Sequence, residues 1–225
     1  LSERVHIEGD DGHHLQRVRR LRIGEHVTLA DGSGRWRLYE ITDAPRGSLV
    51  VDARGEPETE PDLTPRVAVA LALTKGGLES VAARLTEIGV HRISLLATQR
   101  CVVKWEAARA TAATERLRSV AREAAAQSRR ARVPEIGDLV DIRSLAGRPD
   151  VVVADREGVA VSELAEPPDG EWTLVVGPEG GLAPEERALF DAPRLAVGPY
   201  VLRAETAPIA ASAALIGRAR WSVPE

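Results

Sequence analysis

Cysteine is nearly absent from this chain of 225 residues, because Cys101 is the only one. A single thiol excludes an intrachain disulfide, and it also excludes a zinc site built from several cysteine and histidine ligands. Long apolar runs are lacking as well: none approaches the roughly 20 residues that span a bilayer. The first residues, Leu1–Arg4, have no signal-peptide pattern. We therefore expect a soluble protein in a reducing, cytoplasmic compartment.

Net positive charge is also missing, since the formal net charge is −4. A nonspecific, salt-driven nucleic-acid binder is usually strongly basic, so the overall charge argues against that class. Locally the balance reverses. Arg17, Arg19, Arg20 and Arg22 lie within six residues, and the segment 104–132 holds eight basic residues against three acidic ones. These two patches are compatible with a targeted RNA contact, and the competing interpretation is a solvated charged face.

The chain has enough apolar residues, 44%, to bury the core of one large domain or two modest ones. Up to about residue 55, short apolar segments separated by turns predict strands, and Asp31-Gly32 between two of them is a strong hairpin signal. Strands at this spacing suggest a small barrel. The segment 55–65 has three prolines, four acidic residues and no apolar period, which is typical of an interdomain linker.

From Arg66 onward, strand patterns alternate with helical ones, as in a mostly parallel α/β sheet. Val67–Leu73 predicts a strand covered on both faces, and the helical period that follows stops at Gly89. Further strands are predicted at 93–96, 151–154, 173–176 and 194–197, and further helices at 105–130, from 184 and at 206–221. We expect one domain at 1–62, containing the barrel and linker, and an α/β domain at 63–225.

Two glycine-containing turns each leave an apolar strand and enter a helix. The first begins at Gly177 and the second lies within Val197–Thr206. Loops at the carboxyl ends of parallel strands bind ligands in open α/β sheets, and glycines let backbone amides approach a ligand closely. Neither turn matches Gly-x-Gly-x-x-Gly or Gly-x-x-x-x-Gly-Lys-Ser/Thr, so dinucleotide and P-loop sites lose their main support. A cofactor pocket is one interpretation and a plain tight turn is the other.

The pairing of Gly-Pro-Glu-Gly-Gly at 177–181 with Val-Leu-Arg-Ala-Glu-Thr at 201–206 resembles the 16S ribosomal RNA uracil-N3 methyltransferases, a SPOUT family. The resemblance extends over nearly the whole chain, through segments at 12–25, 31–32, 75–76, 85–90, 99–105 and 124–136. It implies a small N-terminal PUA-like β-barrel that binds RNA and a mostly parallel α/β domain with a C-terminal trefoil knot. It also implies a homodimer, S-adenosylmethionine as cofactor, and 16S ribosomal RNA or the small ribosomal subunit as substrate.

By this resemblance, the adenine of S-adenosylmethionine lies among backbone groups of Val176–Gly181, Gly198 and Val201–Leu202. The expected cofactor-binding residues are Val176, Gly177, Pro178, Glu179, Gly180, Gly181, Gly198, Val201, Leu202, Thr206 and Ala207. Glu179 has a second interpretation as a carboxylate that is favourable near a helix N-terminus, and Thr206 has one as a helix cap. The chain departs from the family pattern at Gly77-Leu78, where an acidic and a basic residue are usual, and at Ala204, where threonine is frequent.

Arg203 and Glu205 are the expected catalytic residues. Uracil N3 is a poor nucleophile until its proton leaves or the enolate oxygens are stabilised, so a cation near the ring helps. Arg203, at the cofactor turn, is the best candidate for that electrostatic role, and Glu205 is a candidate to assist proton removal. A structural salt bridge between the two residues is the competing interpretation.

The RNA contacts are expected from the basic patches and from polar residues near the pocket. They are Arg17, Arg20, Arg22, Lys75, Gln127, Arg130 and Arg132. Gln127 shares a predicted helix face with Glu123, and an ordinary exposed face is the alternative there. No metal is expected, because His13 and His14 are adjacent and in a strand would point to opposite faces. The four tryptophans, Trp36, Trp105, Trp172 and Trp221, are expected in the core or an interface.

Two other functions stay open at this point. One is a SPOUT methyltransferase that acts on another ribosomal or transfer RNA nucleotide, with the same cofactor turns and different N-terminal contacts. The other is a noncatalytic RNA-binding assembly protein that keeps the knotted fold.

Overall fold

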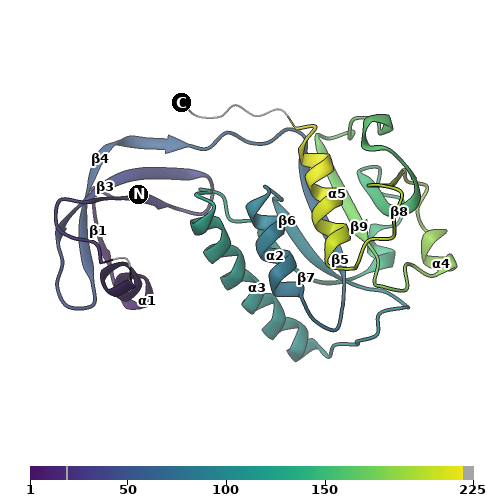
Figure 1. Ribbon diagram of the computed structural model, residues 1–225, viewed down its shortest axis with the longest axis horizontal. Coiled ribbons are helices and arrows are strands. Elements are labelled where there is room, and N and C mark those ends of the chain that lie inside the picture. Colours follow the sequence, from purple (N-terminus) through teal and green to yellow (C-terminus); the bar gives the residue numbers. More distant parts are fainter. Residues whose placement is uncertain (19, 220–225) are drawn as a thin grey trace. The chain divides into compact units, whose positions relative to one another are not determined.

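The chain forms two compact units in a computed structural model that describes residues 1–18 and 20–219 (Figure 1). Unit 1 comprises Leu1–Glu60 together with a short return segment, Arg130–Arg132, and unit 2 comprises Pro61–Arg129 and Val133–Glu225. Arg19 and Trp221, named above, lie outside the described residues. No helix in the described ranges is long and apolar enough to cross a membrane.

Unit 1 is built on a four-stranded antiparallel sheet in the order β1-β4-β3-β2. Its elements are β1 (Arg4–Ile7), α1 (Gly9–His13), the π-helix η1 (His14–Val18), β2 (His26–Ala30), β3 (Arg35–Asp43) and β4 (Leu49–Thr59). Side chains alternate across β3 and β4, so Tyr39, Ile41, Leu49 and Val51 form a fully buried core while the residues between them are only partly buried. The antiparallel, barrel-like N-terminal sheet expected from the turn signals is confirmed.

β4 continues through Gly55–Thr59, so the prediction of a linker over these residues is wrong. The distal end of the strand pairs with β3, for example Glu58 with Trp36. Pro57 is tolerated because β1 pairs only with Leu49–Asp52, which leaves the distal half of β4 as an edge strand. An exposed hairpin end needs no apolar alternation, and this is why the acidic segment resembled a linker.

The segment from Gly9 to Val18 is helical, although the sequence pattern predicted no helix there. His13 ends α1 and His14 begins η1, so the opposite-face geometry of a strand does not apply to this pair. Each of the two helices has only five residues. This length is too short to display a helical apolar period in the sequence.

Unit 2 is a six-stranded parallel sheet in the order β10-β8-β9-β5-β6-β7, which confirms the predicted α/β domain. Its strands are β5 (Arg66–Ala72), β6 (Arg92–Ala97), β7 (Glu135–Asp141), β8 (Val151–Val159), β9 (Glu171–Val176) and β10 (Arg194–Leu195). Its helices are α2 (Leu78–Glu87), α3 (Ala107–Gln127), α4 (Pro184–Arg187) and α5 (Thr206–Ile216), with 3₁₀ turns η2 (Ile142–Leu145) and η3 (Val161–Glu163).

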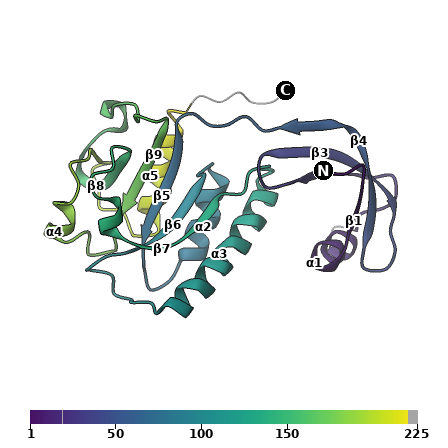
Figure 2. The same ribbon diagram turned by 180° about the vertical axis from the view of Figure 1, so that it is seen from behind.

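The two faces of this sheet carry separate cores. α2, α3 and α5 lie together over one face (Figure 1), and Val69 and Leu71 of β5 belong to the larger core beneath them. The reverse face is nearer the viewer in Figure 2. There Ala70 packs with Ile142 of η2 and Leu182 of the loop before α4. Because side chains alternate along a strand, β5 supplies large residues to one face and alanines to the other.

The edges of the sheet differ most from the prediction. β7 was not predicted, because Ile136 is its only fully buried residue and the other positions are polar or partly exposed. β10 has two residues, Arg194–Leu195, where a strand over 194–197 was expected. Edge strands have fewer buried positions, so their apolar pattern in the sequence is weak.

The return segment of unit 1 is held by hydrogen bonds. The Glu60 carboxylate accepts from the backbone N–H groups of Ala131 (2.5 Å) and Arg132 (3.2 Å), and the Gly34 N–H donates to the Ala131 carbonyl (3.1 Å). The Arg132 guanidinium donates to the carbonyl oxygens of Ser33 (2.6 Å) and Glu60 (3.1 Å). Arg132 therefore has a structural task in unit 1, and its contact with RNA stays a prediction.

Replacing Gly34 tests this packing. Gly34 has a φ of +106°, and a Cβ there would lie 2.5 Å from the Arg132 Cζ. Gly24 also has a positive φ, +89°, but a Cβ there would meet nothing within 4 Å. Both alanine variants carry the cost of a positive φ, about 1 kcal/mol, so Gly34→Ala should lower the free energy of unfolding in urea further than Gly24→Ala. Equal losses would contradict the contact with Arg132.

Candidate active site

Three loops meet at one edge of the parallel sheet. β5 is followed by Thr74–Gly77, β6 by Thr98–Cys101 and β9 by Gly177–Ala183. β5 pairs in parallel with both β6 and β9, so the carboxyl ends of the three strands lie side by side. This is the edge at which open α/β sheets bind ligands.

A buried carboxylate fixes the glycine turn that follows β9. Glu186 is only 8% exposed. Its Oε2 accepts from the backbone N–H of Ala183 (2.9 Å), directly before α4, and its Oε1 accepts from the N–H of Gln99 in the loop after β6 (2.6 Å). The Arg100 Nη1 donates to the Gly180 carbonyl at 2.8 Å. These bonds tie the loop after β6 to the glycine turn.

Neither Glu186 nor Arg100 was predicted from the sequence as a site residue. For Glu186 a local signal existed, because a glutamate at the third position of a helix that starts with proline is typical of a helix N-terminus. Its second bond, to Gln99, joins residues 87 positions apart. Nothing local in the sequence predicts that bond.

The predicted cofactor residues form a buried set and an exposed set. Val176 and Pro178 are buried, and Ala207 packs partly against the same core as Val176. Gly177 is partly buried, and the remaining residues are exposed: Glu179, Gly180, Gly181, Gly198, Val201, Leu202 and Thr206. A Cβ at Gly181 or Gly198 would meet nothing within 4 Å. The backbone of both turns is therefore accessible to a ligand.

The loop after β10 exposes a run of large apolar side chains. Tyr200 is 80% exposed and Val201 77%, and the others are Val197 and Leu202. Single exposed apolar residues are ordinary on protein surfaces. Several in one short loop are typical of a surface that contacts a ligand or another protein.

Arg203 and Glu205 precede α5, and both side chains are exposed. The Arg203 carbonyl accepts from the backbone N–H groups of Thr206 and Ala207, each at 2.9 Å, so its backbone is fixed by the first turn of the helix. Within residues 1–18 and 20–219, the Arg203 guanidinium forms no hydrogen bond or ion pair. The structural salt bridge with Glu205 that was considered above is therefore not formed.

The Glu205 carboxylate lies against Gly77, the residue before α2. A Cβ at Gly77 would be 2.5 Å from the Glu205 Oε1 and 2.9 Å from its Cδ, and Gly77 has a φ of +83°. The departure from the family pattern at Gly77 therefore leaves room for Glu205. The Thr74 hydroxyl donates to the Gly76 carbonyl at 2.8 Å and orders the same loop, which carries the exposed Lys75.

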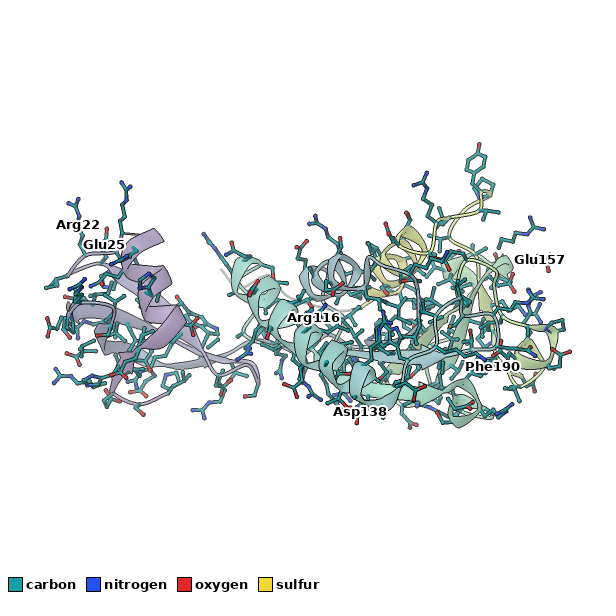
Figure 3. The ribbon with its side chains drawn as sticks, turned by 90° about the horizontal axis from the view of Figure 1, so that it is seen from below. Arg22, Glu25, Arg116, Asp138, Glu157 and Phe190 are labelled. Atoms are coloured by element: carbon teal, nitrogen blue, oxygen red, sulfur yellow. The ribbon has the colours of Figure 1, made fainter. Side chains whose placement is uncertain are left out.

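The predicted RNA contacts divide between the two units. Exposed side chains are those of Arg17, Arg20 and Arg22 in unit 1 and of Lys75 and Gln127 in unit 2. Arg22 lies beside Glu25 (Figure 3), whose carboxylate accepts from the Arg22 backbone N–H at 2.7 Å. Arg130 is partly buried, and burial lowers the pKa of its guanidinium, although the Glu60 carboxylate opposes the change.

The described tryptophans take part in packing. Trp172 is 2% exposed in the larger core of unit 2, and Trp105 packs against that core. Trp36 is partly buried in β3. The Arg218 guanidinium lies 5.1 Å from the centre of the Trp172 ring, within the range of a cation–π contact.

Comparisons with known proteins find two family models that match this chain. An RNA methyltransferase domain model matches residues 61–216, and an RNA methyltransferase PUA domain model matches residues 7–53. A ribosomal RNA small subunit methyltransferase E from Mycobacterium bovis is 37% identical over 229 residues, covering 96% of this chain and 87% of that protein.

Two solved structures have the same fold. A methyltransferase from Legionella pneumophila, in complex with the bound cofactor SAM, has a TM-score of 0.85 at 25% identity and covers 97% of this chain and 93% of that chain. A ribosomal RNA small subunit methyltransferase E from Neisseria gonorrhoeae, bound to S-adenosyl methionine, has a TM-score of 0.84 at 24% identity, with coverages of 96% and 93%.

Glu186→Ala tests the bonds that fix the glycine turn. The variant leaves two backbone N–H groups without their acceptor, that of the buried Ala183 and that of the exposed Gln99. A buried unsatisfied donor such as the Ala183 N–H costs about 1 to 3 kcal/mol. We expect Tm to fall by roughly 5 °C or more. Glu185→Ala, at the exposed neighbouring position, is the matched control and should change Tm little, and Glu186→Gln should lie between the two. Equal Tm values for Glu186→Ala and Glu185→Ala would show that the carboxylate does not fix the turn.

Proposed function

Since the chain belongs to the RNA methyltransferase family that matches residues 61–216, we propose that it transfers the methyl group of S-adenosylmethionine to N3 of a uridine in 16S ribosomal RNA of the small subunit. The observation that carries the proposal is the pair of exposed residues at the start of α5. Within the described residues the Arg203 guanidinium has no partner, and the Glu205 carboxylate lies against Gly77 at the carboxyl edge of the sheet. The Mycobacterium bovis relative, a ribosomal RNA small subunit methyltransferase E, supports the class of substrate.

The residues of the two turns fit S-adenosylmethionine, which is also the cofactor bound in two of the similar structures. At Gly181 and Gly198 no atom lies within 4 Å of the position that a Cβ would take. The backbone N–H and C=O groups there are therefore open to hydrogen bonds with the polar edge of an adenine. Val201 and Leu202 offer exposed apolar surface for its ring faces. When bound, the cofactor supplies an electrophilic methyl group. We assign its binding to Val176–Gly181, Gly198, Val201, Leu202, Thr206 and Ala207.

Arg203 and Glu205 supply the polar chemistry in this proposal. Glu205 accepts the proton of uracil N3, which makes the nitrogen nucleophilic. The negative charge that develops over N3 and the neighbouring carbonyl oxygens faces the Arg203 guanidinium. Because the Arg203 side chain has no partner within the described chain, its guanidinium breaks no protein contact when the base arrives.

The substrate and a second copy of the chain complete the proposal. Arg17, Arg20, Arg22, Lys75, Gln127, Arg130 and Arg132 are proposed to contact RNA. The exposed apolar loop that contains Tyr200 and Val201 is proposed to be covered in a homodimer, which would remove its apolar surface from water. The trefoil knot, the cytoplasmic location and the roles of the two units as separate domains stay predictions.

Methyl transfer from labelled cofactor tests the function directly. The purified protein is incubated with tritiated S-adenosylmethionine and either naked 16S ribosomal RNA or small subunits, and the labelled nucleotide is then mapped. We expect a single 3-methyluridine. Label on another nucleotide would assign the chain to a different methyltransferase of this fold. RNA binding without transfer would favour the noncatalytic assembly protein.

Arg203→Ala separates the catalytic role from a structural one. Loss of one preorganised electrostatic donor should lower the single-turnover rate by roughly a hundredfold or more. Tm should change little, because the side chain has no bond within the described residues. Arg203→Lys should restore only part of the rate, since a point charge lacks the planar fork of a guanidinium. Near-normal turnover in folded Arg203→Ala would overturn the assignment.

A further inference from the structure

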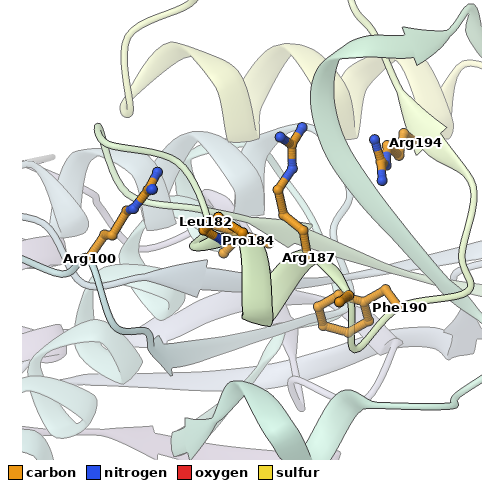
Figure 4. A pocket seen from close by; sticks show the side chains of 7 residues that line it. Arg100, Leu182, Pro184, Arg187, Phe190 and Arg194 are labelled. Atoms are coloured by element: carbon orange, nitrogen blue, oxygen red, sulfur yellow. The ribbon is translucent and has the colours of Figure 1, made fainter.

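A hollow beside the glycine turn is not part of the predicted cofactor or RNA sites. Its volume is about 420 Å³, and Figure 4 shows its lining. We call it the arginine hollow, and its residues are Arg100, Leu182, Pro184, Arg187, Ala188, Phe190 and Arg194. Leu182 and Pro184 continue directly from the glycine turn, and Arg100 is bonded to Gly180 of that turn. The hollow therefore lies next to the proposed cofactor site.

Three arginines reach this hollow from separate segments. Arg100 comes from the loop after β6, Arg187 from α4 and Arg194 from β10, and in Figure 4 Arg187 lies between the other two. Like charges gathered in one hollow repel one another unless carboxylates or a bound anion compensate them. An arginine whose positive charge a carboxylate already compensates has less attraction for an anion.

Of these three arginines, Arg187 alone has a carboxylate partner among the residues that the structure describes. Its guanidinium is paired with Asp155 and lies 3.9 Å from the Glu157 Oε2. Arg100 donates to a carbonyl oxygen, which orients its guanidinium and leaves the positive charge uncompensated. The Arg194 guanidinium forms no hydrogen bond or ion pair in the described part of the chain, although Arg194 and Asp155 interact through their charges. Arg100 and Arg194 are both exposed.

We propose that the arginine hollow binds a phosphate group of the RNA strand adjacent to the target nucleotide. This inference rests on the proposed function. Arg100 and Arg194 are exposed and line the same hollow, and a guanidinium group can donate two parallel hydrogen bonds to phosphate oxygens. The volume is larger than a phosphate alone requires, and the partly buried Phe190 supplies an apolar wall for the attached ribose or base. A phosphate held here fixes the strand close to the cofactor turn.

Arg194→Gln tests the proposal in the full-length protein. The variant should fold normally, because the side chain has no bond within the described residues. Affinity for a 16S ribosomal RNA fragment containing the target, measured by fluorescence anisotropy, should fall by roughly tenfold. The slope of log K against log salt should become shallower by about one, as expected when one phosphate contact is lost. Arg100→Gln should act in the same direction, and Arg194→Lys should retain most of the slope. Calorimetry should show unchanged S-adenosylmethionine affinity for Arg194→Gln.

Arg143→Gln is the matched control. Arg143 is exposed, belongs to unit 2 and does not line the hollow, so its removal should leave RNA affinity and salt slope nearly unchanged. If Arg194→Gln and the wild type bind RNA with equal affinity and equal slope, the proposal is overturned. A wild type that methylates ribosomal RNA in the same experiment would leave the proposed function standing, whereas a wild type that neither binds nor methylates RNA overturns the function first.

A free phosphate compound shares the chemistry of an RNA phosphate, so a second titration separates the two sources. Inorganic phosphate and AMP are added to the wild type and to Arg194→Gln, and each is also tested as a competitor of the RNA fragment. Competition that requires Arg194 supports the RNA phosphate site. Binding of inorganic phosphate or AMP that needs Arg194, with RNA affinity equal in both proteins, assigns the hollow to a small phosphate ligand and overturns the proposal.

Discussion

The parallel pairing of β5 with β9 on one side and with β6 on the other is the constraint on which unit 2 depends. β5 is buried on both faces, with large residues such as Val69 and Leu71 toward the helices and Ala68 and Ala70 on the reverse face. A slip of one residue would exchange these two sets, so packing fixes the register. The register in turn decides which loops meet at the carboxyl edge. The candidate active site is therefore positioned by the core beneath it.

Two carboxylates at that edge have opposite uses because their surroundings differ. Glu186 is buried and accepts two backbone hydrogen bonds, one from each loop. Its carboxylate therefore connects the loop of Gln99 to the glycine turn. Glu205 is exposed and is placed by the missing side chain of Gly77. A buried carboxylate with both oxygens bonded stabilises structure, whereas an exposed one on an ordered backbone is available to a substrate proton.

The sequence predicted those parts of the molecule in which local pattern and burial agree. β5 is a continuous apolar run, and α2 ends just before Gly89 as expected. The segment Gly9–Val18 was not predicted, because its two helices are too short to show an apolar period. The strand β7 was not predicted, because it has a single buried residue. In the site, the two turns and the exposed pair at α5 followed from a family resemblance. The bond of Arg100 to Gly180 joins residues 80 positions apart, and only the fold brings them together.

An acidic protein that acts on RNA depends on which of its arginines remain uncompensated. At physiological salt, charges more than about 8 Å apart are largely screened, so the net charge of −4 matters less than the local pairing. Burial is the largest single influence on Asp155 and acts to raise its pKa, but the hydrogen bonds from Arg187 and from the Glu157 N–H, together with the charges of Arg187 and Arg194, outweigh it and lower that pKa. Asp155 therefore remains charged and paired with Arg187. Arg187 consequently adds little to the outward field. Arg194 and Arg203 have no partner in the described chain, and both are exposed near the glycine turn or the start of α5. These two arginines therefore offer positive charge to a polyanion beside the candidate active site, although the protein as a whole is acidic.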